Sequence, residues 1–147
     1  MIQSKQILYV CIGAAGAGKT THSTPFCREF GILRLSIDET RAAYRKTVVN
    51  PSFQEVERMA FSIYDSNVHY FLGAGYSVLL DNMNHTTAIR AKYLQIAKLL
   101  SVRCFALFYQ TNPALCIKRV MERDGHIPTP RTIVPPQPGE FDNIQYL

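Results

Sequence analysis

The chain has 147 residues, of which 47% are hydrophobic and 18% are charged. This length fits one domain with its own packed core, and the composition excludes an intrinsically disordered chain. No apolar run approaches the ~20 residues that a membrane-spanning helix needs, so we expect a cytoplasmic protein without membrane contact. The formal net charge of +5 favours an anionic partner.

Strands and helices are expected to alternate along the chain, which predicts an α/β fold with a mostly parallel sheet. Residues 6–12 form a continuous apolar run, typical of a central strand that is buried on both faces. The pattern then predicts a helix over about 18–30, a short strand over 32–36 and a polar helix over 38–47. Cysteines without metal-binding spacing fall in apolar segments, and we expect reduced, buried thiols at Cys11, Cys27, Cys104 and Cys116.

The middle of the chain continues this alternation. Ser52 and Glu55 have the capping-box spacing that begins a helix, and this helix is expected to extend to about Leu72. The next predicted elements are a strand over 76–81, a helix over 86–100 and a strand over 102–110.

The last predicted helix begins at Asn112 and is expected to turn Leu115, Val120 and Met121 toward the core. The proline-rich segment over 124–139 has no helical periodicity and predicts a loop. Together these elements predict a three-layer α/β fold, in which helices cover both faces of a parallel sheet of four to five strands. We expect the third strand to lie beside the first.

A glycine-rich segment follows the first predicted strand and begins the first helix. It matches the P-loop pattern G-x-x-x-x-G-K-[ST] in full. Glycines let backbone N–H groups surround a phosphate, while Lys19 can neutralise phosphate oxygens and Thr20 can ligate Mg²⁺. We therefore assign the binding of ATP, or of another nucleoside triphosphate, to Gly13, Ala14, Ala15, Gly16, Ala17, Gly18, Lys19, Thr20 and the adjacent Thr21.

Asp38 and Arg41 follow the second predicted strand and are spaced to share one helical face. The carboxyl ends of strands in α/β sheets are where such folds bind their ligands. Asp38 could accept the proton of an acceptor hydroxyl, and Arg41 could hold an anionic group of the acceptor. A helix-capping aspartate beside an exposed arginine fits the same spacing, so the residues alone leave both interpretations open.

Two further pairs of polar residues are candidates for the same site. Asp81 and Asn84 follow the third predicted strand, where they could orient a Mg²⁺-bound water, support the loop, bind the acceptor or cap the next helix. Arg119 and Arg123 are four residues apart on one face of the last helix and could close over the nucleotide phosphates. A solvated helix face is the alternative for this second pair.

The combined motifs resemble the polynucleotide 5′-kinase group, the kinase module of T4-type polynucleotide kinase/phosphatases and of bacterial RNA-repair enzymes. The shared motifs are GxxGxGKT, S-x-D-x-x-R, DNxN, R-x-x-x-R and P-x-x-G-E-F-D-x-I, and they span about residues 7–144. The chain departs from that group in having Gly16-Ala17-Gly18 in place of Gly-Ser-Gly. It also lacks a phosphatase or ligase module, so we expect a stand-alone kinase or a module of a larger repair enzyme.

The resemblance implies a role for each candidate residue. Asp38 would be the general base that deprotonates a 5′-hydroxyl of RNA or DNA, and Arg41 would bind the phosphate on the 3′ side of the terminal nucleoside. Lys19 and Arg123 would be the catalytic cations on the phosphates of ATP·Mg²⁺, with Arg119 assisting. Asp81 and Asn84 would belong to the substrate side of the site.

We expect one kinase domain over 1–147, with a lid over about 119–133 and a C-terminal tail over 134–147. Two other functions fit the sequence. One is a small-molecule kinase that acts on an antibiotic, a sugar acid or a nucleoside, although a neutral small acceptor would have no use for an arginine aimed at a phosphate, as Arg41 is expected to be. A non-catalytic nucleotide-binding module would need neither Asp38 nor Arg123. The guanine-reading motifs D-x-x-G and N-K-x-D do not follow the P-loop, which argues against a GTPase.

Overall fold

A computed structural model describes residues 6–147, and its strands form one parallel sheet in the order β2-β3-β1-β4-β5. The strands are β1 (Ile7–Ile12), β2 (Leu33–Ser36), β3 (Val78–Asp81), β4 (Arg103–Phe108) and β5 (Asn143–Tyr146). The first strand pairs with both β3 and β4, so it is the central strand. The predicted placement of the third strand beside the first is therefore confirmed.

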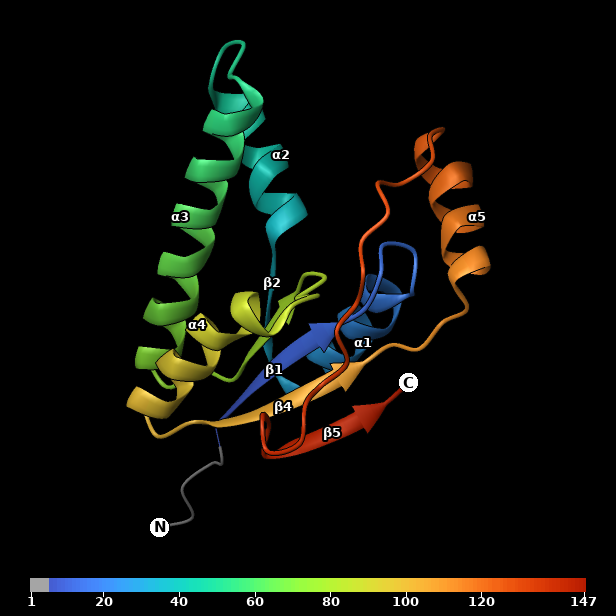
Figure 1. Ribbon diagram of the computed structural model, residues 1–147. Coiled ribbons are helices and arrows are strands. Elements are labelled where there is room, and N and C mark those ends of the chain that lie inside the picture. Colours follow the sequence, from blue (N-terminus) through green and yellow to red (C-terminus); the bar gives the residue numbers. More distant parts are fainter. Residues whose placement is uncertain (1–5) are drawn as a thin grey trace.

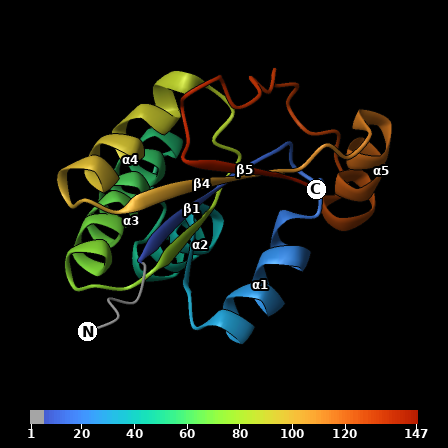
Figure 2. The ribbon, with the colours of Figure 1, turned by 90° about the horizontal axis from the view of Figure 1, so that it is seen from below.

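Helices cover both faces of the sheet, as predicted (Figures 1 and 2). They are α1 (Lys19–Phe30), α2 (Ile37–Thr47), α3 (Phe53–Gly73), α4 (Thr87–Leu99) and α5 (Pro113–Asp124). The view from below shows α3 and α4 on one side of the strands and α1 on the other (Figure 2). Helix α2 packs along α3, and α5 lies near the end of β4 (Figure 1).

The alternation of side chains along the central strands divides the core into two clusters. Leu8 and Val10 of β1 pack with buried residues of α3 and α4, whereas Cys11 packs in the cluster on the α1 side. In β3, Leu80 joins the first cluster and Leu79 the second. All five side chains are fully buried, and each such burial contributes roughly 1.5–3 kcal/mol for a residue as large as valine or leucine.

Helix α5 packs differently from the prediction. Val120 is buried as expected, but the side chains of Leu115 and Met121 are exposed, and Cys116 is buried instead. The helix contacts the domain along a narrow strip at the P-loop, where Gly16 lies against the backbone of Cys116. Because only this strip is covered, the expected inward positions of Leu115 and Met121 were wrong.

The C-terminal segment is held to the domain by a buried arginine. Arg90 of α4 is completely buried and donates to both carboxylate oxygens of Glu140, at 2.8 and 2.9 Å, and to the Val134 carbonyl oxygen at 2.8 Å. Residues 125–137 contain no helix or strand, in agreement with the predicted loop. The tail then forms β5, an edge strand for which the sequence pattern gave no specific signal.

The structure of residues 6–147 bears on the expected state of the cysteines and on the expected lack of a membrane-spanning helix. All four cysteines are buried free thiols, as expected. Within this described part of the chain, no helix combines the length and the apolar character required to cross a membrane.

Candidate active site

The P-loop connects β1 to α1 and requires its glycines for two separate reasons. Gly16 and Gly18 have φ angles of +81° and +94°, which L side chains rarely adopt. A Cβ on Gly16 would also lie 2.4 Å from the carbonyl oxygen of Cys116, so α5 could not approach the loop as it does. Thr111 fixes the loop from the other side, because its hydroxyl donates to the Ala17 carbonyl oxygen at 2.7 Å.

Lys19 is directed back into this loop. Its ammonium group donates to the carbonyl oxygens of Gly13 and Ala14 at 3.0 and 2.7 Å, and only 9% of the residue is exposed. Burial lowers the pKa of Lys19 below its ordinary value, and the nearby carboxylate of Asp81 partly opposes that shift. The hydrogen-bond partners of this ammonium group are neutral carbonyl oxygens, so a phosphate bound in the loop would supply an anionic partner.

Asp81 at the end of β3 receives three hydrogen bonds on one carboxylate oxygen. Its Oδ2 accepts from the Thr20 hydroxyl at 2.8 Å and from Nε and Nη2 of Arg34 at 3.0 and 2.7 Å. Thr20 and Asp81 thus bring together the hard oxygen donors that Mg²⁺ prefers. These two residues fit a magnesium site at the P-loop, beside the half-buried Arg34, which had no signal in the sequence.

Asp38 and Arg41 lie on one face of α2, as their spacing predicts, and their side chains form a 2.7 Å ion pair. Ser36 caps this helix by accepting from the Glu39 amide, so Asp38 is not the capping residue. The Asp38 side chain is 87% exposed and free to meet an acceptor. Arg41 is also held by both oxygens of Glu57 on α3, at 2.6 and 3.0 Å.

The remaining predicted residues occupy different depths of the site. Asn84 is buried with a φ of +45°, and its amide nitrogen donates to the Cys11 carbonyl oxygen at 2.8 Å. Arg119 reaches the P-loop, where its Nη1 donates to the Gly16 carbonyl oxygen at 3.2 Å. Arg123 is exposed and pairs with its neighbour Asp124 through two hydrogen bonds of 2.9 Å.

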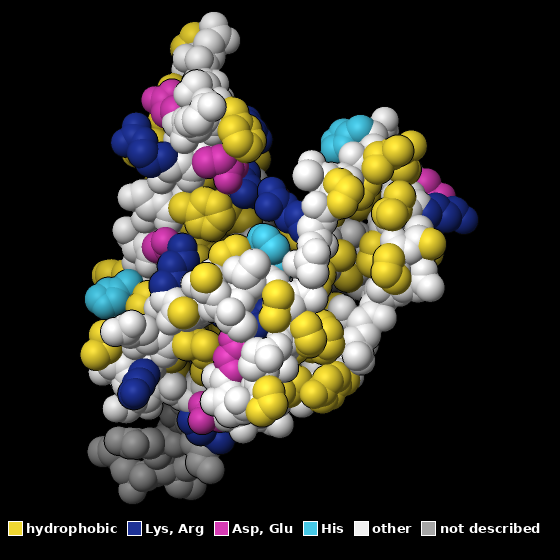
Figure 3. All heavy atoms as spheres, in the orientation of Figure 1, with side chains coloured by type: hydrophobic (Ala, Val, Ile, Leu, Met, Phe, Trp, Pro, Cys, Tyr) yellow, Lys and Arg dark blue, Asp and Glu magenta, His cyan; other side chains and the backbone are white. Residues whose placement is uncertain are grey.

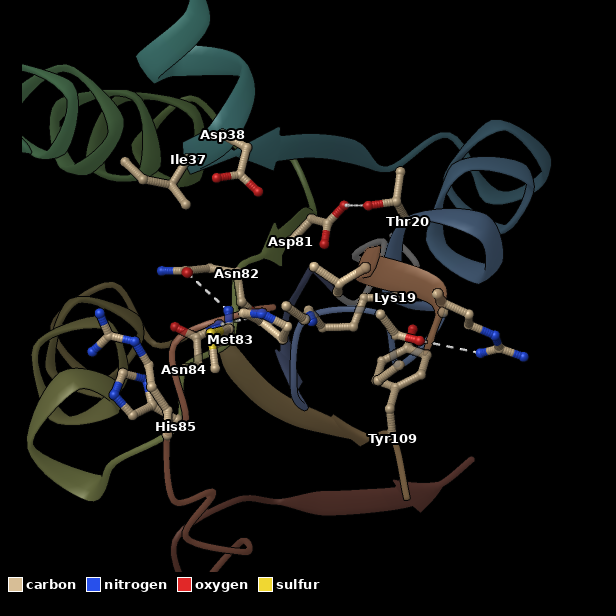
Figure 4. A pocket seen from close by; sticks show the side chains of 18 of the residues that line it. Lys19, Thr20, Ile37, Asp38, Asp81, Asn82, Met83, Asn84, His85 and Tyr109 are labelled. Carbon is tan, nitrogen blue, oxygen red and sulfur yellow. Dashed lines mark hydrogen bonds between the residues drawn. The ribbon is translucent and has the colours of Figure 1, made fainter. Parts of the chain in front are cut away.

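One open cavity of about 1670 Å³ joins these residues. It occupies the groove that Figure 3 shows between α2–α3 and α5, above the carboxyl ends of the strands. Asp38, Asp81 and Thr20 approach it from three different elements, with Lys19 beside them (Figure 4). Of the predicted site residues, Gly13 and Ala14 alone do not line this cavity; they form the loop behind it.

Several residues of the cavity were not identified from the sequence. Tyr109 follows β4, and its hydroxyl shares a 2.7 Å hydrogen bond with Nδ1 of His22. It also packs closely on the P-loop, since a Cβ added to Gly13 would lie 3.0 Å from the Cβ of Tyr109. Glu57 lines the cavity, whereas Arg34 does not line it but binds Asp81. Both were missed because each acts through a partner that is distant in sequence, Arg41 for Glu57 and Asp81 for Arg34. No local spacing rule reports such contacts, since they depend on the order of strands and on the packing of α2 against α3.

A family model described as an AAA domain matches residues 8–133, which is most of the chain. A comparison with curated proteins found no significant match.

Solved structures resemble the whole fold at low sequence identity. A candidate kinase from Chloroflexus aurantiacus is 14% identical with a TM-score of 0.72, covering 83% of this chain and 68% of its own. The Pnkp1/Rnl/Hen1 complex has 17% identity and a TM-score of 0.65, covering 78% of this chain and 39% of that chain. The APS kinase CysC of Mycobacterium tuberculosis, in complex with AMPPNP and APS, has 18% identity and a TM-score of 0.57. The match covers 97% of this chain and 88% of that chain. The chain thus spans less than half of the matched chain in the Pnkp1 complex.

Proposed function

The chain belongs to this AAA domain family, and from that premise we propose that it is an ATP-dependent kinase that transfers the γ-phosphate to a 5′-hydroxyl of nucleic acid. The observation that carries the proposal is the pairing of Asp38 with Arg41 in the same cavity as the P-loop. A kinase needs a group that receives the acceptor proton, and a nucleic-acid acceptor also offers a phosphate to an arginine.

Asp38 is suited to the role of general base. Its exposed carboxylate stands in the first turn of α2, where the acceptor can reach it from the cavity. The hydrogen bond from Arg41 occupies Oδ1, so Oδ2 is the oxygen that would take the hydroxyl proton. The resulting alkoxide character develops next to the P-loop, where the γ-phosphate would lie.

Arg41 is suited to anchoring the acceptor. Its three hydrogen bonds to Asp38 and Glu57 leave further N–H donors of the guanidinium group unused. The two carboxylates hold the side chain in one orientation, so little conformational entropy is lost when a phosphate binds the remaining donors. We assign the phosphate on the 3′ side of the terminal nucleoside to this position.

On the donor side, Lys19, Arg119 and Arg123 are the cations that would contact the nucleotide phosphates. Thr20 and Asp81 would hold Mg²⁺, which neutralises charge on the β- and γ-phosphate oxygens when it is bound. Asn84 supports the loop after β3 through its bond to the Cys11 carbonyl oxygen. Arg119 already touches the P-loop, whereas Arg123 would have to leave Asp124 to reach the nucleotide.

A kinase of a small anionic molecule is the second candidate. It is favoured by the extent of the fold shared with the APS kinase, 97% of this chain and 88% of the other. Arg41 would then bind an anionic group of a small molecule instead of a nucleic-acid phosphate. The two candidates differ in the acceptor and not in the use of the P-loop.

Substitution of the α2 pair tests the assignment. Asp38→Asn should leave ATP affinity unchanged and lower phosphate transfer to a 5′-hydroxyl oligonucleotide by about 10²–10⁴-fold, since it removes the proton acceptor. Arg41→Ala should instead raise the KM for the oligonucleotide by about tenfold to a hundredfold, the range for a charge-assisted contact. Arg58→Ala on the exposed side of α3 is the matched control. Full activity of Asp38→Asn would contradict the proposal.

A further inference from the structure

Phe61 of α3 is an aromatic side chain on the acceptor wall of the cavity. It is half-buried and lines the same cavity as Arg41 and Glu57. The guanidinium carbon of Arg41 lies 5.6 Å from the centroid of its ring, and the Lys92 ammonium nitrogen lies 5.1 Å from it. One cation from α2 and another from α4 therefore lie over the ring at cation–π distance, and the Lys92 ammonium group also pairs with Asp65 at 2.9 Å.

The ring is held in place from behind by other aromatic side chains. Phe61 meets Tyr64 edge to face at a centroid distance of 6.4 Å, and Tyr64 meets Tyr93 in the same way at 6.1 Å. Both tyrosines are fully buried, and the Tyr93 hydroxyl donates to Asp65 at 2.7 Å. Phe61 is thus the outermost ring of a buried column, and a ligand that stacks on it would lose little entropy in ordering the site.

The surroundings of the ring combine apolar and basic character. Ile89 lines the cavity on this side, together with Lys92, His85 and Arg131. Burial lowers the pKa of His85, and the positive charges of Arg131 and Arg90 lower it further. Figure 3 shows hydrophobic and basic side chains adjacent to one another in the groove beside α3. A flat apolar group joined to an anion matches this wall better than a sugar or a simple anion does.

We propose that Phe61 determines acceptor specificity by stacking against the nucleobase of the 5′-terminal nucleotide, while Arg41 and Lys92 hold the phosphate on its 3′ side. The inference rests on the proposed function and assigns its acceptor subsite. A nucleotide carries both a planar base and an anionic phosphate, the two groups that the Phe61 ring and the neighbouring cations would bind. Stacking of one base on one aromatic ring changes affinity by about tenfold to a hundredfold.

The test uses two 5′-hydroxyl oligonucleotides that differ only in the first nucleotide, which carries a base in one and is abasic in the other. For the wild type, kcat/KM should favour the acceptor with the base by about tenfold to a hundredfold. Phe61→Leu keeps an apolar side chain for core packing but removes the ring, so this preference should nearly disappear. Phe61→Tyr keeps the ring and should retain the preference.

Phe71→Leu is the matched control, because Phe71 is a half-buried phenylalanine of the same helix that does not line the cavity. It should keep the wild-type preference. Comparing the two acceptors within one variant cancels any common loss from reduced stability. A preference that persists in Phe61→Leu would overturn this inference alone. A wild type that phosphorylates neither oligonucleotide would overturn the proposed function and this inference with it.

Discussion

The ammonium group of Lys19 lies inside the P-loop with backbone carbonyl oxygens as its hydrogen-bond partners. Burial holds its pKa below the ordinary value for lysine. A bound triphosphate would favour the charged form and raise that pKa again. Nucleotide binding and protonation of Lys19 should therefore be linked, each favouring the other.

This linkage predicts how nucleotide affinity depends on pH. ATP affinity should be constant while Lys19 is fully protonated in the free protein and should fall as pH rises through its lowered pKa. The measurement is the ATP dissociation constant from neutral to alkaline pH at fixed Mg²⁺ concentration. Lys19→Met should bind ATP more weakly and without this pH dependence. An equal fall in both proteins would contradict the assignment of the titrating group.

At the scale of single elements, α3 begins at a side-chain cap. The Ser52 hydroxyl accepts from the Glu55 amide at 3.1 Å, as the capping-box spacing predicted. In a complete capping box, the Glu55 carboxylate would accept a hydrogen bond from the Ser52 amide. Here it instead accepts from the Tyr44 hydroxyl at 3.1 Å, which is a tertiary contact. The cap therefore stabilises the helix, and Glu55 connects it to α2.

Ser52→Ala should lower the free energy of unfolding by about 1 kcal/mol, because the first turn of α3 loses its cap. Urea denaturation monitored by circular dichroism measures this change. The control is Ser62→Ala, at an exposed position inside the same helix, which should be neutral or slightly stabilising. Since the cap lies away from the cavity, catalytic constants of Ser52→Ala should match the wild type. Unchanged stability would show that the cap contributes nothing.

Most elements could be predicted from the sequence because their signals are local. The apolar run before the P-loop and the glycine pattern after it are enough to place β1 and α1. The edge strand β5 has a mostly exposed sequence, so neither periodicity nor apolar content distinguishes it from a loop. The wrong orientation of Leu115 arose because helical periodicity identifies an apolar face without showing whether another element covers it.

The residues of the candidate site also differ in whether the local sequence identifies them. The P-loop and the Asp38–Arg41 pair are contiguous motifs, and the structure brings them to one cavity. Arg34 and Phe61 could not be found by such reasoning, since their importance depends on partners contributed by β3 and α4. Long-range packing decides that Phe61 lines the cavity and that Arg34 binds Asp81 behind it.

At the scale of the whole molecule, the Arg90–Glu140 pair fixes the segment that leads into β5. Glu140→Ala would leave the guanidinium group of Arg90 buried without its counter-charge. We expect a loss of about 3–5 kcal/mol in the free energy of unfolding, measured by urea denaturation. Replacing both partners, as in Arg90→Met with Glu140→Gln, should recover part of this loss because no unpaired charge remains.

A surface ion pair provides the comparison for that experiment. Glu39 pairs with Arg34 at 2.7 Å but has a side chain that is 66% exposed, so Glu39→Gln should change stability by less than about 1 kcal/mol. If Glu140→Ala were as mild as Glu39→Gln, the buried pair would not be what holds the C-terminal segment in place.

The acceptor of the γ-phosphate is identified most directly by offering labelled ATP and a panel of acceptors to the wild-type protein. The panel contains a 5′-hydroxyl oligonucleotide, the same oligonucleotide with a 5′-phosphate, a 3′-nucleoside monophosphate, a nucleoside, APS and gluconate. We predict the highest kcat/KM for the 5′-hydroxyl oligonucleotide, weaker transfer to the 3′-nucleoside monophosphate and none to the blocked oligonucleotide. Preferred transfer to APS, gluconate or a plain nucleoside would contradict a nucleic-acid acceptor.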